Sequence, residues 1–72
     1  MDDTTLQRKL DLMVKLGNEI DAEAKRRYGP DALLFHEADG GLMIMERLTD
    51  RGNQNDNVRF CATNVRWGSG AF

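Results

Sequence analysis

The sequence has only one cysteine, one histidine and one proline among its 72 residues. The single cysteine, Cys61, excludes an internal disulfide, and together with His36 it cannot complete a structural zinc site from sulfur and nitrogen ligands. A chain of this length forms one small domain, residues 1–72, which buries only about 60 % of the surface that its unfolded form exposes. Such domains often gain stability from a disulfide, a metal or an oligomer. Association with another chain is the support that the composition leaves open.

The chain also lacks a strong charge of one sign, a long apolar run and an export signal. Twelve acidic and ten basic side chains give a net charge of −2, which is too weak a field to attract nucleic acid or a membrane surface strongly. No apolar run approaches the roughly 20 residues that span a bilayer. Asp2 and Asp3 stand where a signal peptide would carry basic residues. With the lone thiol, these absences predict a cytoplasmic protein.

No arrangement of catalytic, metal-binding or nucleotide-binding residues stands out. His36-Glu37 is not followed by the second histidine of a zinc-protease motif. Residues 50–57 contain oxygen ligands without the spacing of a calcium-binding loop. Gly40-Gly41 precedes no helix, so it does not form a phosphate-binding loop. We therefore expect no enzyme activity, no cofactor and no metal.

A helix is predicted over residues 4–28. Thr4 and Gln7 fit a capping box at its start, and Gly29-Pro30 ends it. Spacings of four and three alternate along one stripe, which consists of Leu6, Leu10, Met13, Gly17, Ile20 and Ala24. Leu12, Val14 and Leu16 widen the stripe in the first half to an apolar arc of about 200°, twice what a core-facing helix needs. Acid-first pairs four residues apart support the helix: Asp11 with Lys15, Asp21 with Lys25, and Glu23 with Arg27.

After Pro30 the apolar period changes from 3.6 to 2, which indicates strands. We predict strands over residues 32–38, 42–48 and 58–67, followed by a flexible tail at 68–72. The first two form a hairpin with a glycine-rich turn. The fold class is therefore α+β, in the order α-β-β-β, with one amphipathic helix packed on one face of a three-stranded antiparallel sheet.

The length of the hairpin turn decides which side chains face the helix. A two-residue turn at Asp39-Gly40 or Gly40-Gly41 pairs odd-numbered residues of the first strand with even-numbered residues of the second, and a three-residue turn reverses this pairing. With two residues, the helix-facing side carries Leu33, Phe35, Glu37, Leu42, Ile44, Glu46, Leu48 and Phe60. The open side then carries Leu34, His36, Ala38, Met43, Met45 and Arg47, joined by Val65 and Trp67.

One helix covers one face of the sheet, so the chain has more apolar surface than a single core requires. We predict that the surplus forms a protein interface, since contiguous apolar patches often do and Met adapts to a partner's shape. Its candidate residues are Leu34, Met43, Met45, Leu12, Leu16 and Trp67. The predicted function is that of a non-catalytic interaction domain, a regulator, inhibitor or assembly factor, whose partner is a second copy (a homodimer) or a different protein. Domains of this size are common among phage and mobile-element accessory proteins.

Two alternatives depend on other residues. A weak nucleic-acid-binding module would use Arg47, Arg51, Arg59 and Arg66, with stacking on Phe60 and Trp67. Four arginines beside an acidic helix are a weak electrostatic footprint, so this function is the less favoured one. A dyad of Cys61 and His36 is disfavoured because the outer strands of the sheet lie about 10 Å apart, beyond hydrogen-bond reach.

Overall fold

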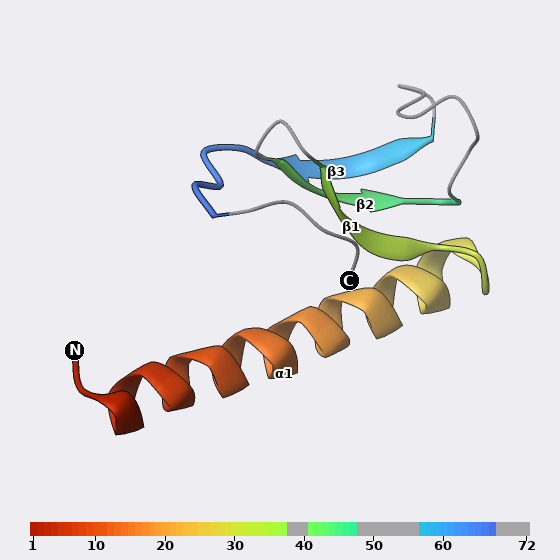
Figure 1. The fold of residues 1–72 in the computed structure, drawn as a ribbon. Coiled ribbons are helices and arrows are strands. Elements are labelled where there is room, and N and C mark those ends of the chain that lie inside the picture. The colour runs from red at the N-terminus through yellow and green to blue at the C-terminus, as the bar shows by residue number, and fades with distance from the viewer. Residues whose placement is uncertain (38–40, 48–56, 68–72) are drawn as a thin grey trace.

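The computed structural model describes residues 1–37, 41–47 and 57–67 and has the predicted α+β architecture. Helix α1 (Asp3–Tyr28) is followed by strands β1 (Leu33–Glu37), β2 (Gly41–Met45) and β3 (Val58–Ala62). The strands form an antiparallel sheet in the order β1-β2-β3, and α1 lies across one face of it (Figure 1). The α-β-β-β prediction is thus confirmed, while the predicted tail at 68–72 lies outside the described residues. Within the part of the chain that is described, no helix has the length and apolarity to cross a membrane.

The helix begins one residue earlier than predicted because Asp2, rather than Thr4, is its N-cap. The carboxylate of Asp2 accepts a hydrogen bond from the backbone N–H of Thr5 at 2.7 Å. This bond, with a smaller contribution from the Thr5 side chain, lowers the pKa of Asp2. A carboxylate at this position also meets the positive end of the helix dipole. The Gln7 side chain, freed from the predicted capping box, donates instead to Asp11.

The end of the helix is the predicted one. Gly29 has φ 109° and its backbone N–H donates to the carbonyl of Lys25 at 2.9 Å. A positive φ of this kind suits glycine because no Cβ is present to clash. Pro30 follows and cannot continue the helix. Two of the predicted ion pairs, Lys25 with Asp21 and Arg27 with Glu23, are present in the last turns.

The face of β1 that lies toward the helix is the opposite of the predicted one. Leu34 pairs with Ile44, and His36 pairs with Leu42, so these four residues share one face of the sheet. Three residues, 38–40, separate the two strands, which is the spacing that reverses the predicted pairing. The expectation that Leu34 and His36 lie on the open face is therefore wrong.

Close approach of α1 to β1 identifies the helix-facing side. A Cβ built on Gly17 would lie 3.7 Å from Cδ2 of Leu34. Ile44 pairs with Phe60 across β2 and β3, which places Phe60 on this side as predicted. The predicted placement of Leu33 and Phe35 on the helix-facing side is wrong, because both alternate with Leu34 and lie on the far side of the sheet.

Met43 and Met45 also lie on the far side, as predicted, but they are not exposed there. Their side chains are 5 % and 2 % exposed, and Met45 is the largest fully buried side chain among the described residues. Leu33 and Phe35, their partners in β1, are half-buried. Both faces of the sheet therefore contribute buried side chains.

The third strand is shorter than predicted and the chain changes direction after it. Regular pairing ends at Ala62, and Asn64 has φ 66°, in the left-handed region that Asn adopts more readily than most residues. This bend returns Trp67 to the helix-facing side, where its ring centroid lies 5.4 Å from that of His36. The predicted position of Trp67 on the side of Met43 is therefore wrong.

Candidate functional site

The helix is much longer than the sheet on which it lies. Its 26 residues span about 39 Å at 1.5 Å per residue, whereas each five-residue strand spans about 17 Å. The C-terminal half of α1 lies against β1 and, over fewer residues, β2. The N-terminal half (red to orange in Figure 1) extends past the strands. We call residues 3–12, the first turns of this half, the overhang.

Apolar side chains of the overhang are open to solvent. Leu6, Leu10 and Leu12 are 56, 53 and 51 % exposed, and Met13, Val14 and Leu16 in the next turn are also exposed. Among the residues of α1 only Ala24 is fully buried. The apolar stripe read from the sequence is therefore present, but the sheet covers only its last turns.

A groove runs beside α1 because the helix lies over one edge of the sheet. With α1 against β1, the β2–β3 part of the same face is left uncovered, and it forms one wall of a hollow of about 380 Å³. Its apolar lining includes Met13, Leu16, Ile20, Ile44, Phe60 and Trp67. A second hollow of about 320 Å³, also bordered by Ile20, Ile44 and Phe60, continues it toward the C-terminal end of α1. We call the two hollows together the groove.

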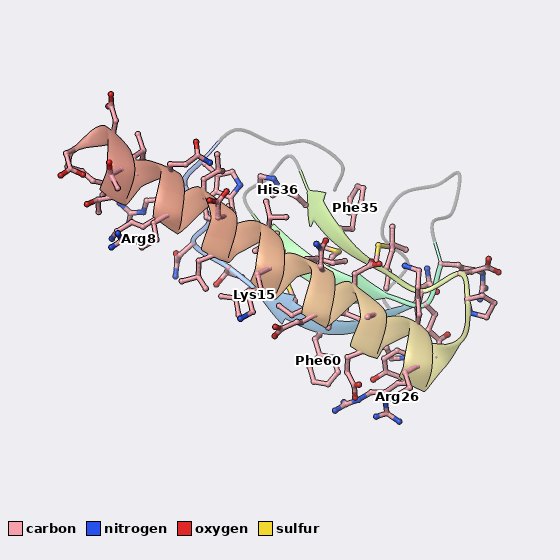
Figure 2. All side chains as sticks on the ribbon, turned by 90° about the horizontal axis from the view of Figure 1, so that it is seen from below. Arg8, Lys15, Arg26, Phe35, His36 and Phe60 are labelled. Carbon is pink, nitrogen blue, oxygen red and sulfur yellow. The ribbon has the colours of Figure 1, made fainter. Side chains whose placement is uncertain are left out.

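Aromatic side chains mark the open wall of the groove. Phe60 and Trp67 are 50 % and 47 % exposed although both lie on the helix-facing side. Figure 2 shows Phe60 projecting beside α1, on the same flank as Arg8, Lys15 and Arg26. The groove thus has an apolar floor and a charged border.

Ion pairs neutralise the border near the C-terminal end of α1. Glu23 accepts hydrogen bonds from Arg26 and Arg27, which lower the pKa of its carboxyl to about 2. The same bonds raise the pKa of both arginines. The Arg27 guanidinium also lies 6.0 Å from the centroid of the Phe60 ring, within range of a cation–π contact. These charges are satisfied within the chain.

The predicted interface residues fall into two groups. Leu12, Leu16 and Trp67 are exposed, and Leu16 and Trp67 line the groove. Leu34, Met43 and Met45 are buried, so they offer no surface to a partner. Sequence reasoning missed the exposure of Phe60. Comparing the 26-residue helix with the short strands would have indicated the overhang.

The arginines of the nucleic-acid alternative do not form one patch among the described residues. Arg59 is bound to Glu46 at 2.6 Å and lies 5.8 Å from the Tyr28 ring centroid. Arg47 follows the end of β2 and Arg66 follows the end of β3. Because the two strands are antiparallel, their C-terminal ends lie at opposite ends of the sheet. The remaining candidate, Arg51, lies outside the described residues.

The cysteine and the histidine lie on opposite faces of the sheet. His36 faces the helix side and is 3 % exposed, whereas Cys61 pairs with Met43 on the far side and is exposed. Two strand spacings and the sheet itself separate the pair, which gives no nucleophile–base geometry. Within the described ranges, no three His, Cys, Asp or Glu side chains are placed to hold a metal.

No known protein family, curated protein or solved structure is detectably similar to this chain. What the protein does must therefore be inferred from its own surface.

Proposed function

We propose that the protein is a non-catalytic interaction module that binds another polypeptide through the overhang and the groove. The observation that supports this function is the band of half-exposed apolar side chains on one side of α1, formed by Leu6, Leu12, Met13 and Leu16, which is continuous with an apolar groove. Contiguous apolar surface of this kind marks interaction sites more often than it marks idle surface. The module acts by occupying a partner's surface, as a regulator, inhibitor or assembly factor does.

The available apolar area is large enough to support binding. Full burial of a Leu or Met side chain contributes roughly 1.5 to 3 kcal/mol relative to full exposure. Covering four half-exposed side chains of this type therefore contributes on the order of 4 kcal/mol before the entropic cost of association. These side chains are Leu6, Leu12, Met13 and Leu16. The helix is already formed, so little ordering is needed on binding.

The shape of the surface indicates the kind of segment that it binds. A groove beside a helix, with an apolar floor and charged borders, suits an amphipathic helix of the partner. Such a helix would contact α1 with its apolar side and the border with its polar side. The proposed partner segment is therefore a helix, not an extended peptide.

The proposal is tested by cross-linking in the native host with a tagged protein. A Leu12→Glu/Leu16→Glu variant places charge on the side of α1 that borders the groove, which we call the groove flank. We expect this variant to lose its cross-linked partners. Val14→Glu is the matched control, because Val14 is equally exposed but lies about 160° around the helix from both Leu12 and Leu16. Unchanged cross-links in the double variant would show that this surface does not bind protein.

Salt dependence separates this function from binding of nucleic acid. Affinity for a protein partner should change little with added salt, since apolar burial provides most of the free energy. Phosphate contacts would instead weaken steeply, through release of counterions. A steep decline of affinity with salt would therefore contradict the proposal.

A further inference from the structure

We infer that the helix that occupies the groove is α1 of a second copy of this chain. The two α1 helices lie antiparallel, and the overhang of each copy rests in the groove of the other. This inference depends on the proposed function, because it names the partner of the same surface. Three features of the chain support it.

The first feature is the match in length between the overhang and the sheet. The overhang has ten residues and spans about 15 Å, and each strand of the sheet spans about 17 Å. The overhang of one copy is thus about as long as the uncovered β2–β3 part of the sheet in the other copy. In the dimer, each overhang would cover that part of the other sheet.

The second feature is the lateral spacing of the elements. Packed helices lie 8 to 10 Å apart, and the two outer strands of a three-stranded sheet lie about 10 Å apart. Since α1 lies against β1, a second helix packed beside it is placed over β3. Phe60 projects from β3 at this position and would lie under the second helix (Figure 2).

The third feature is the self-complementary order of residues along the groove flank of α1. In an antiparallel pair centred at the level of residue 14, residues equally far before and after that level face one another. Leu12 of one copy then faces Leu16 of the other, and Lys9 faces Glu19. Lys9 and Glu19 are exposed in the single chain. The pairing joins apolar side chains at the centre and opposite charges farther out.

Sedimentation equilibrium of the purified protein tests the inference through a charge exchange. We expect the wild type to be a dimer in the micromolar range. Lys9→Glu alone and Glu19→Lys alone should each weaken the dimer about tenfold, because both symmetry-related pairs become like-charged. The double variant Lys9→Glu/Glu19→Lys should restore the wild-type affinity, which only an antiparallel contact between copies predicts.

Two further variants locate the contact on the groove flank. Leu16→Glu should weaken the dimer more than a hundredfold, whereas Val14→Glu, on the opposite flank, should leave it unchanged. Circular dichroism confirms that each variant retains its helix, and Leu16→Gln replaces Leu16→Glu if the latter unfolds.

A monomeric wild type at every concentration would overturn the inference. So would failure of the double charge exchange to restore the dimer, or an equal effect of Val14→Glu. If the purified protein is monomeric while host partners still depend on Leu12 and Leu16, the proposed function holds and only the second copy is excluded. If neither association depends on these residues, both proposals fail.

Discussion

The carboxylate of Asp21 in α1 accepts a hydrogen bond from the backbone N–H of Leu34 in β1 across 2.9 Å. Its second oxygen accepts a hydrogen bond from Lys25. The Lys25 bond and then the Leu34 bond lower the pKa of Asp21. Because β1 is an edge strand, some of its N–H groups have no partner in the sheet. Asp21 thus joins the helix to the sheet and satisfies a donor at the exposed edge.

Replacing Asp21 tests this contact. Asp21→Ala should lower the free energy of unfolding by about 1 kcal/mol, because the N–H of Leu34 loses its acceptor and the site is partly exposed. Asp21→Asn keeps an acceptor oxygen and should lower it by about half as much. Urea unfolding at pH 7 measures both values. Equal losses in the two variants would show that the ion pair with Lys25, not the bond to Leu34, is what matters.

Acid should destabilise the protein partly through Glu23. Its pKa is lowered to about 2 in the folded chain, so its contribution to stability is fully present above the unfolded value of about 4.3. That contribution is lost as the pH falls from about 4.3 toward 2. Glu23→Gln should therefore flatten the curve of melting temperature against pH in this range. If the melting temperature of wild type and of Glu23→Gln fell equally steeply in this pH range, the lowered pKa of Glu23 would be contradicted.

Gly17→Ala should stabilise the protein. Glycine within a helix costs about 1 kcal/mol relative to Ala, and the new Cβ would meet Leu34 at 3.7 Å, an ordinary contact distance. The melting temperature should rise by about 4 to 8 °C for a domain of this size. A lower melting temperature would mean that α1 and β1 pack too tightly for one more carbon.

Gly29→Ala should have the opposite effect. The φ of 109° and ψ of 172° at this position fall in a region that is nearly restricted to glycine. The same substitution should therefore destabilise by about 1 to 3 kcal/mol, even though open space surrounds the new Cβ. Thermal unfolding of Gly29→Ala and Gly17→Ala under the same conditions compares the two substitutions directly. A neutral result would indicate that the turn before Pro30 relaxes to a negative φ.

Met45→Ala should cost about 2 to 5 kcal/mol because its side chain is 2 % exposed and its removal leaves a cavity. This is a large part of the stability of about 4 to 11 kcal/mol expected for 72 residues. Met13→Ala, at a half-exposed position, is the control and should cost about 0.5 kcal/mol under conditions that keep the protein monomeric. Similar losses at the two positions would contradict the burial of Met45.

The helix and the order of the strands follow from sequence because they depend on local signals. Gly29-Pro30 and the alternating spacings of three and four are physical features of neighbouring residues. The faces of the hairpin depend instead on the length of one turn. Both Asp39-Gly40 and Gly40-Gly41 favour a two-residue turn, but strands that end at Glu37 and begin at Gly41 leave three residues between them. One residue of difference exchanges the faces of β1.

The part of the candidate site that lies on the helix could be predicted because it depends on local signals, and the rest could not. The wide apolar arc around Leu12 and Leu16 is a property of the helix alone and is visible in the sequence. The positions of Met45 and Trp67 depend on contacts far along the chain. Trp67 lies on the helix side because the strand ends at Ala62 and the chain bends at Asn64, and neither follows from an apolar pattern that continues to residue 67.

The order in which the elements pack has a consequence for synthesis. Each element lies chiefly against the next one along the chain, α1 on β1, β1 on β2 and β2 on β3. Contacts of this near-neighbour kind favour fast folding and can form as the chain leaves the ribosome. The groove is the exception, since its walls come from α1 and β3, the first and last elements. The apolar side of the helix is therefore synthesised first, whereas the groove that would receive it exists only in a finished chain. Pairing of two copies would thus be restricted to chains that have completed their fold.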